Sequence, residues 1–501
     1  MSKFGKNTIS NIITKIWSMV SIYFFIPLYI QILGETSYGL VSFFTTLQSA
    51  LQLLGLGLSN TLRREFAISN EGENSKNKKY LLLRSVENIY FLIGALIICV
   101  CCFGANTIAT YWLNTESLDS KVVSMVIRLM GVSIAIQMIA NLYIGCLFGL
   151  DRQVIANICT VLWSMGKSIG SLLIIRFIKP SLVLFYGWHI IIDIIYLLFV
   201  RFLVIENLKL DKKTKWSVKD LSNLQTIWNY AMGILLISII ALINKQLDKI
   251  IISKYLTISE LGAYNTATTL GGVTGIISSA VFTSIFPRFT KKATSGNQEE
   301  IISNFKIVNK IVNVFLSSMG CFISVYSLPL IRLWTKSEYY VEVLGYAGLL
   351  VVLAVTMIEF QQIPYAFALA HGNTKINTIV GISFIPIEAI ATLYFIKNYG
   401  LIGAGTIHFI MMTGQTLIYE YLVYKTYISK KSIKMIITDT IVPIVLSFLS
   451  AVISRTIINR ITDNILIICL FGIIVGGITA LMLLLTYSNR EVKLFVSLKE
   501  D

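Results

Sequence analysis

The residues of this sequence that could do chemistry are ionisable side chains inside or beside long apolar stretches. The bases of this set are Lys15, Arg128, Lys167, Lys245 and Lys249, and the other members are His189, Asp193, Asp248, Glu359 and Glu388. An ionisable group at membrane depth is costly unless it faces a bundle interior, a partner or a wet cavity, so such residues often mark functional sites. Bases in a cavity could hold the phosphates of an anionic substrate through charge-assisted hydrogen bonds. The pattern therefore predicts a cationic, substrate-binding cavity.

Each of these residues also has a structural explanation. Arg128 and Lys249 fall near the ends of their apolar stretches and could extend to lipid headgroups. Lys245 or Lys249 could pair with Asp248 on one helix, where side chains three or four residues apart meet. Lys167 has no acid close in sequence and lies deep in its stretch, which favours a place in the cavity lining.

The acids and His189 suggest coupling or structural roles. His189 and Asp193 are four residues apart and would share a helix face. A proton-coupled exporter could use such a pair, since His titrates near neutral pH, but a buried hydrogen-bonded pair is the simpler explanation. The polar stretch around Glu359 and Pro364, and Pro386 beside Glu388, predict bent helices.

Motifs for enzymatic or metal chemistry are missing from the sequence. The 7 cysteines all fall in apolar stretches, and the 3 histidines lie on different stretches with no metal-ligand spacing. There is no Gly-rich phosphate loop and no Gly-x-Ser-x-Gly elbow. We expect no catalytic residues, no metal and no cofactor, apart from a coupling ion such as H⁺ or Na⁺.

The elements that must position these residues are membrane helices. The chain of 501 residues is 55% hydrophobic and only 14% charged, against about 25% charged in soluble domains. The net charge of +16 comes from bases that lie between apolar stretches, so it indicates membrane topology rather than nucleic-acid binding. These features predict an all-α polytopic membrane protein.

About fourteen stretches are long and apolar enough to cross a bilayer, which requires about 20 residues. They lie near 8–33 and 38–62, end near 112, 149, 176 and 205, and continue near 227–255, 262–286, 307–334, 343–370, 376–397, 401–424, 435–458 and 465–487. Lys and Arg gather in alternate loops, which the positive-inside rule makes cytoplasmic. An even number of spans then places both termini in the cytoplasm.

The spans divide into two similar halves. Tyr38 and Tyr264 open the second and eighth spans, and Arg63 and Arg288 close them at nearly the same offset. This predicts a parallel repeat of two six-helix lobes, as in alternating-access transporters. The predicted domains are a first lobe at 1–206, a cytoplasmic linker at 207–225, a second lobe at 226–425, and two extra helices with a tail at 426–501.

Short motifs at these boundaries carry a family likeness. The entry from Leu33 to Gly39, the pair Arg63 and Arg64, the segment 247–264 with its Leu-Gly-Ala-Tyr end, and the turn at 372–375 occur in order along the whole chain. The chain resembles Wzx-type O-antigen flippases of the polysaccharide-transporter branch of the MOP superfamily.

This resemblance implies a flippase of the bacterial inner membrane. Its cargo would be an undecaprenyl-pyrophosphate-linked oligosaccharide, and its partners a polysaccharide polymerase and a chain-length regulator. It implies that Arg63 and Arg64 bind substrate, although both could be ordinary cytoplasmic anchors, and that Lys15 occupies a position often basic in such flippases. The residues after Tyr264 lack the Arg of the related lipid II flippases, which argues against a peptidoglycan precursor as cargo.

Two other functions fit parts of the pattern. A cation-coupled multidrug exporter of the same superfamily would favour an acidic cavity, whereas bases outnumber acids here. A membrane polysaccharide polymerase would need a sizeable outer loop with catalytic residues, and the outer loops are short.

Overall fold

The structure is a computed structural model that describes residues 3–68, 73–115, 118–208, 225–294, 298–428 and 432–486. The chain forms two compact units, Met1–Ser259 and Glu260–Asp501, which we describe separately. The first unit includes the helix that follows the predicted linker at 207–225, and most of that linker lies outside the described residues.

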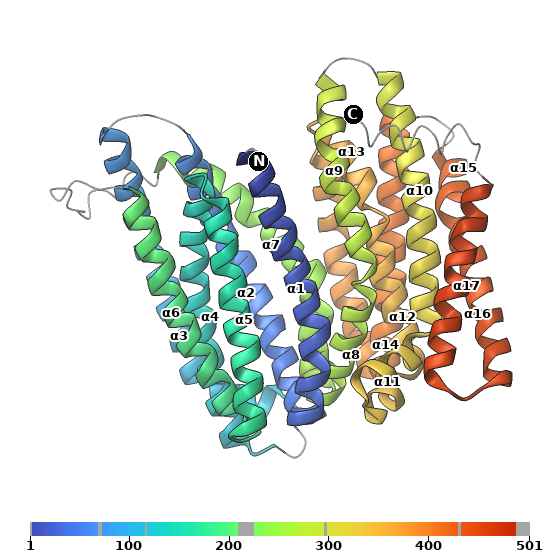
Figure 1. The fold of residues 1–501 in the computed structure, drawn as a ribbon, viewed down its shortest axis with the longest axis horizontal. Helices are drawn as coiled ribbons and strands as arrows, with labels where there is room; N and C mark the ends of the chain where they lie inside the picture. The colour runs from blue at the N-terminus through green and yellow to red at the C-terminus, as the bar shows by residue number, and fades with distance from the viewer. Residues whose placement is uncertain are drawn as a thin grey trace. The chain divides into compact units, whose positions relative to one another are not determined.

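The first unit is a helical bundle centred on α4 (Figure 1). Its elements are α1 (Lys3–Leu33), α2 (Glu35–Ala67), α3 (Glu73–Thr107), η1 (Ile108–Trp112), α4 (Ser120–Gly149), α5 (Gln153–Phe177), α6 (Leu182–Leu208) and α7 (Gln225–Tyr255). Helix α4 packs against α2, α3 and α6, and its buried residues, such as Leu142 and Leu147, form much of the apolar core. Helix α7 packs along α2.

The second unit is built around α10. Its elements are α8 (Ile258–Gly271), α9 (Thr274–Thr294), α10 (Gln298–Val325), α11 (Ser327–Thr335), α12 (Glu338–Glu359), α13 (Gln362–Ala370), α14 (Lys375–Tyr427), α15 (Ser432–Ile436), the π-helix η3 (Ile437–Ile441), α16 (Val442–Ile461) and α17 (Ile465–Leu485). Helix α10 packs against α9, α12, α16 and α17, with aromatic residues such as Phe305 and Phe367 in the core.

The prediction of an all-α polytopic membrane protein is confirmed, but the number of about fourteen spans is not. Ten of the described helical segments are long and apolar enough to cross a membrane, or eleven if the bent pair α8 and α9 forms one span. Helices α2 and α7 are not among them, although they are 33 and 31 residues long. The single helix α14 covers two predicted spans and breaks at Gly400, which has a φ of 60°. The side of the membrane on which the termini lie stays a prediction.

One of the two bends predicted from the sequence coincides with a helix end. Helix α12 ends at Glu359 and α13 begins at Gln362, at the polar stretch. Helix α14 continues through Pro386, so the bend predicted there stays a prediction, and its residue with non-helical dihedral angles is Gly400. A proline removes one hydrogen bond that a membrane helix can replace locally, whereas a glycine permits the positive φ.

A basic segment expected to be a loop is largely helical. Helix α3 begins at Glu73, so Lys76, Lys79 and Arg84 lie on the helix rather than before it. Lys79 donates a hydrogen bond to the carbonyl of Phe66 near the end of α2, 3.0 Å away, and thereby ties the two helices together.

Gly39 allows a close approach within the first unit. A Cβ atom added at Gly39 of α2 would lie 2.1 Å from the carbonyl oxygen of Ile258, which is a rigid backbone atom. Beside this contact, Ser259 donates a hydrogen bond to Thr36, 2.9 Å away. Any side chain at residue 39 must therefore separate α2 from the segment that leads into α8.

We expect Gly39→Ala to destabilise the protein by about 1–3 kcal/mol, the usual cost of overpacking. Gly187→Ala is the matched control, because an added Cβ there meets nothing within 4 Å. Its effect should be neutral or slightly stabilising, since alanine favours helix more than glycine does. The melting temperatures of the purified proteins in detergent test this, and equal values for the two variants would contradict the close contact.

Candidate functional site

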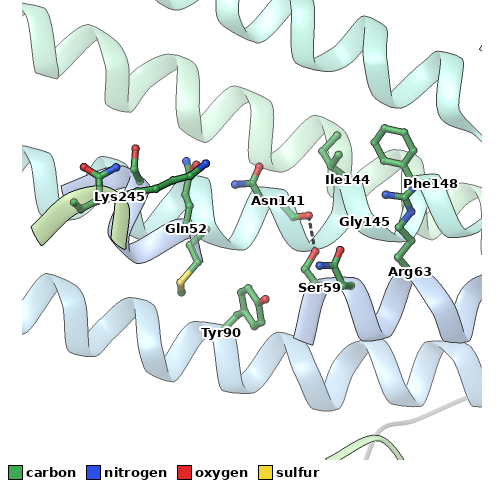
Figure 2. Close-up of a pocket in the computed structure, with 13 residues that line it drawn as sticks. Gln52, Ser59, Arg63, Tyr90, Asn141, Ile144, Gly145, Phe148 and Lys245 are labelled. Carbon is green, nitrogen blue, oxygen red and sulfur yellow. Dashed lines mark hydrogen bonds between the residues drawn. The ribbon is translucent and has the colours of Figure 1, made fainter. Parts of the chain in front are cut away.

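A polar recess of about 600 Å³ lies between α2, α3, α4 and α7 of the first unit (Figure 2). We call it the polar recess, and its lining is Ser49, Gln52, Ser59, Asn60, Arg63, Tyr90, Met138, Asn141, Ile144, Gly145, Phe148, Lys245 and Gln246. The volume falls within the usual range of about 300–1,000 Å³ for small-molecule sites. The recess is therefore large enough for a substrate headgroup.

Helical periodicity on α2 brings its polar side chains to the recess. Ser49, Gln52, Ser59 and Arg63 are separated by three, seven and four residues, which places them along one helix face. Gly145 on α4 allows the two helices to approach, because a Cβ there would lie 2.7 Å from the Ser59 hydroxyl. That hydroxyl donates to the carbonyl of Asn141, 3.3 Å away, so α2 and α4 are bonded across the floor of the recess.

The charges of the recess are all positive. Arg63 and Lys245 are its two bases, both are solvent-exposed, and none of the described lining residues is an acid. Figure 2 shows them at opposite ends of the lining, with Gln52, Asn141 and Ser59 between them. The guanidinium of Arg63 lies over the Phe148 ring, 4.7 Å from its centroid, which restrains its position. The arrangement suits an anionic group flanked by hydroxyl-rich surface.

A buried hydrogen-bond network begins beside this recess. The Gln137 side-chain oxygen on α4 accepts hydrogen bonds from Gln48 and, at 3.4 Å, from the recess residue Gln52. The Gln137 amide nitrogen donates to Ser133 and to the Asp193 carboxylate, 3.0 Å away. The recess is thus connected through two glutamines to a buried carboxylate on α6.

Asp193 is fully buried and has several partners. Ser133 donates to its carboxylate at 2.5 Å, Trp163 donates at 2.8 Å, and the Lys167 ammonium lies 3.3 Å away. The Lys167 ammonium also lies 4.9 Å from the centre of the Trp163 ring. Lys167 has no acid close in sequence, but the adjacent helix α6 supplies Asp193 as its partner. Lys167 is not among the residues that line the polar recess.

The predicted pairing of His189 with Asp193 does not form. Asp193 accepts hydrogen bonds from Ser133, Gln137, Trp163 and Lys167, and not from His189. The imidazole packs on Phe185, with ring centroids 4.3 Å apart, and its buried Nδ1 has no hydrogen-bond partner. The four-residue spacing on one helix was therefore not sufficient to join the two side chains.

The other predicted bases of the first unit lie outside the recess lining. Lys15 is exposed on α1, and Lys249 is partly buried on α7 beside the buried Asp248. Arg128 is partly buried and approaches the Asn106 side-chain oxygen at 3.4 Å. Arg64 is exposed and lies 3.5 Å from Glu65. Their predicted part in substrate binding stays a prediction.

The two predicted acids of the second unit are on different helices. Glu359 ends α12 and accepts a hydrogen bond from Ser278 of α9. Glu388 is buried on α14. Their predicted coupling or structural roles also stay predictions.

A second recess, entirely apolar in its exposed lining, adjoins the first on the same four helices. This apolar recess of about 500 Å³ is lined by Phe43, Leu47, Ala50, Leu51, Leu96, Ile97, Val100, Cys101, Ile108, Trp112, Ile127, Met130, Gly131, Ile134, Ile250 and Ser253. On α2 the two linings interleave, since Ser49 and Gln52 line the polar recess and Ala50 and Leu51 line the apolar one, and on α4 the apolar lining ends at Ile134, one turn before Met138. The helices of the first unit therefore form both a recess with polar and basic residues and an apolar recess.

Comparisons with known proteins identify the family of this chain. Residues 4–293 match the family described as "Polysaccharide biosynthesis protein". The chain belongs to this family. It is also 22% identical, over 390 residues, to a Shigella flexneri protein named "Putative O-antigen transporter", covering 74% of this chain and 86% of the relative.

Solved structures share the fold of this polysaccharide biosynthesis protein. The lipid II flippase MurJ in an inward closed conformation matches with a TM-score of 0.69 at 16% identity, covering 95% of this chain and 97% of MurJ. An inward-facing MATE multidrug resistance transporter of the MOP superfamily matches with a TM-score of 0.62 at 14% identity, covering 85% and 98% of the two chains. The expected likeness to flippases and exporters of the MOP superfamily is confirmed at the level of the fold, and the chain is a multi-pass membrane protein.

Sequence reasoning missed the uncharged lining of the recess in this polysaccharide biosynthesis protein. Gln52, Asn60 and Asn141 were not candidates, because the search considered charges alone. For Gln52 the signal is the helical spacing of polar residues on α2, described above. Glu87 was not a candidate from the sequence either. Its buried carboxylate lies 2.8 Å from the guanidinium of Arg84 and 3.1 Å from that of Arg201, and it accepts a hydrogen bond from Tyr143.

We expect Lys167→Met and Asp193→Asn each to destabilise this polysaccharide biosynthesis protein, because each leaves an uncompensated buried group. Removing one partner of a buried pair typically costs about 3–5 kcal/mol. The double variant should lose much less than the sum, since neither charge remains. Thermal unfolding of the purified single and double variants measures this, and additive losses would show that the pair is not coupled.

Proposed function

We propose that the protein is a flippase that moves an undecaprenyl-pyrophosphate-linked oligosaccharide from the cytoplasmic to the periplasmic leaflet of the bacterial inner membrane. The observation that carries this proposal is the polar recess, which has two bases and, among the described lining residues, no acid. Family membership and the flippase and exporter fold support it.

The polar recess suits the headgroup of such a lipid. A diphosphate cannot leave water without partners, because burying an isolated charge is prohibitive. Arg63 and Lys245 offer charge-assisted hydrogen bonds to its oxygens. The amides of Gln52, Asn60 and Asn141 can replace the water bound to sugar hydroxyls.

The apolar recess suits part of the hydrocarbon chain. Its exposed lining has no polar area, and Ser253, which lies among the lining residues, donates its hydroxyl to the carbonyl of Ile250. Because α2, α3, α4 and α7 line both recesses, an amphiphilic lipid could place its headgroup and the first part of its chain in one bundle. The rest of a long chain would remain in the bilayer.

Alternating access would complete the reaction. The headgroup enters from the cytoplasmic side, where the positive-inside rule places Arg63, and movement of the helical units releases it on the other side. The protein thereby avoids the step that makes uncatalysed flipping slow, which is the transfer of a hydrated sugar through hydrocarbon. A polymerase and a chain-length regulator are expected to act on the released lipid.

We expect Arg63→Gln and Lys245→Gln to abolish most surface polysaccharide while leaving the amount of membrane protein unchanged. Arg152→Gln is the matched control, since Arg152 is an exposed base of the same unit that is not part of the lining. Its export should equal that of the wild type. Surface glycan immunoblots and membrane immunoblots of a deletion strain carrying each variant give both quantities.

Other results would contradict the proposal. Full export from both Arg63→Gln and Lys245→Gln would exclude the polar recess as the headgroup site. Drug resistance that depends on the protein, without a glycan defect in the deletion strain, would favour a multidrug exporter. Glycan units that reach the periplasm but stay unpolymerised would favour a polymerase.

We expect Val100→Trp to slow flipping by filling the apolar recess. Val100 is 58% exposed, so the larger side chain can be accommodated without disturbing the buried core. The matched control is Gly477→Leu, which fills an apolar groove of the second unit at a position where an added Cβ meets nothing within 4 Å. Transport in proteoliposomes should fall for Val100→Trp with a long-chain lipid-linked sugar and less with a short-chain analogue. If Gly477→Leu slowed transport more than Val100→Trp, the hydrocarbon chain of the lipid would instead bind in the second unit.

A further inference from the structure

Two arginines on different helices of the first unit meet at one buried carboxylate. Glu87 of α3 is buried, and its carboxylate accepts a hydrogen bond from Tyr143 of α4. Arg84, one turn earlier on α3, donates to this carboxylate at 2.8 Å, and Nε of Arg201 on α6 lies 3.1 Å from it. Side chains from α3, α4 and α6 therefore converge on this one acid, and we call Arg84 and Arg201 the arginine pair.

The arginine pair carries more charge than its acid can neutralise. Glu87 compensates one guanidinium and leaves one net positive charge. Within the part of the chain that the structure describes, neither arginine has a second acid as an ion-pair partner, and this includes Glu206, the next acid along α6. An unmatched positive charge on a membrane-spanning bundle favours an anionic ligand that the protein itself does not supply.

Both guanidiniums keep N–H groups for such a ligand. Arg84 donates Nε to the Tyr80 hydroxyl at 3.0 Å and Nη1 to Glu87, which leaves Nη2. The terminal nitrogens of Arg201 form no hydrogen bond with any residue that the structure describes. The two side chains are 31% and 35% exposed. Guanidiniums that are already held in place lose little freedom on binding, and their paired N–H groups match the oxygens of a phosphate.

The helix faces that carry the arginine pair continue as apolar surface. Phe91 follows Arg84 by seven residues, and Ile194 precedes Arg201 by seven, so each shares the face of its arginine about 10 Å further along the helix. Both apolar side chains are exposed, as are Leu92 of α3 and Leu198 of α6. Exposed apolar side chains of a membrane-spanning bundle face hydrocarbon chains.

The two apolar faces extend from the arginine pair in the same direction. At the level of Glu87, α4 contributes Tyr143. Further along α3, a Cβ added at Gly131 of α4 would lie 2.4 Å from Cys101, and back along α6, Asp193 accepts a hydrogen bond from Ser133 of α4. Helices α3 and α6 are therefore antiparallel beside α4, with their charged ends together and their apolar faces at the same depth.

The arginine pair lies outside both recesses. Neither arginine is among the lining residues of the polar or the apolar recess. On α3 the linings use Tyr90 and Ile97, whose faces are turned by about 120° or more from that of Arg84. A ligand of the arginine pair is thus separate from one held in the polar recess.

We infer that Arg84 and Arg201 bind the phosphate of an anionic phospholipid, with its acyl chains along the exposed apolar faces of α3 and α6. The positive-inside rule places both arginines at the cytoplasmic side, and basic clusters between membrane helices on that side are typical sites for anionic headgroups. The bound lipid stabilises the packing of α3 and α6 on α4. This site does not depend on the proposed cargo, so it is tested without transport.

The experiment is thermal unfolding of the delipidated full-length protein in detergent. The protein receives phosphatidylglycerol, or phosphatidylcholine with the same acyl chains. A ligand that binds only the folded state stabilises it, so phosphatidylglycerol should raise the wild-type melting temperature by about 2 °C or more above its value in phosphatidylcholine. Arg201→Gln should lose more than half of this rise, while Arg84 still neutralises Glu87 in that variant.

Two control variants separate the site from general effects. Arg152→Gln removes an exposed base of the same unit that lies outside the arginine pair, and it should keep the full rise. Arg201→Lys keeps a positive charge beside Glu87 but lacks the planar guanidinium, so it should fold and lose part of the rise. Because each rise is measured against the same variant in phosphatidylcholine, a change in basal stability does not alter the comparison.

Each outcome decides the inference. A rise that is specific for phosphatidylglycerol and depends on Arg201 supports it. An equal rise in both lipids, or a full rise in Arg201→Gln, overturns it. If inorganic phosphate alone produced the same Arg201-dependent rise, the ligand would be a free anion rather than a phospholipid. If undecaprenyl phosphate produced a larger Arg201-dependent rise than phosphatidylglycerol, the occupant would be a cargo-like lipid, and the phospholipid would be excluded.

Discussion

The free-energy cost of an unpartnered charge in an apolar bundle is the constraint on which the arrangement of this protein depends. In the first unit, the Asp193 carboxylate on α6 is met by Lys167 and Trp163 from α5 and by Ser133 and Gln137 from α4. No single helix could satisfy this carboxylate alone. Its burial therefore requires three helices to keep one mutual register.

The same constraint explains why the polar recess is basic. Lys167 is neutralised within its unit, so it adds little net charge to its surroundings, whereas Arg63 and Lys245 share a lining without an acid. Exposed bases of this kind keep their charge available for a ligand. The structure thus separates cations that hold helices together from cations that can hold a substrate, although both kinds look alike in the sequence.

Features that depend on neighbouring residues in the sequence could be predicted, and features that depend on contacts between separate helices could not. Hydropathy is local, so the all-α membrane fold and the break after Glu359 could be predicted, whereas the continuity of α14 through Pro386 depends on neighbours that the sequence does not reveal. Lys167 and Asp193 are 26 residues apart in the sequence and lie on different helices. Only the packing of α5 against α6 shows that the lysine has a partner. Two residues of the recess lining were candidates from the sequence, Lys245 as a base within an apolar stretch and Arg63 through the family resemblance, and their part in binding stays a prediction. Gln52 was not a candidate, because an uncharged amide in an apolar stretch does not show from the sequence whether it faces a cavity.

The adjacency of the two recesses has a mechanical consequence for an amphiphilic cargo. Helices α2, α3, α4 and α7 contribute residues to both recesses, and along α4 the lining changes from apolar at Ile134 to that of the polar recess at Met138. If these helices move together, a bound headgroup and the first part of its chain keep their partners throughout the movement, because neither recess has to be dismantled. A site assembled from separately moving parts would expose either the diphosphate to hydrocarbon or the chain to water at some stage. If the proposed cargo is correct, placing both recesses in one bundle with an ion-paired interior avoids that stage.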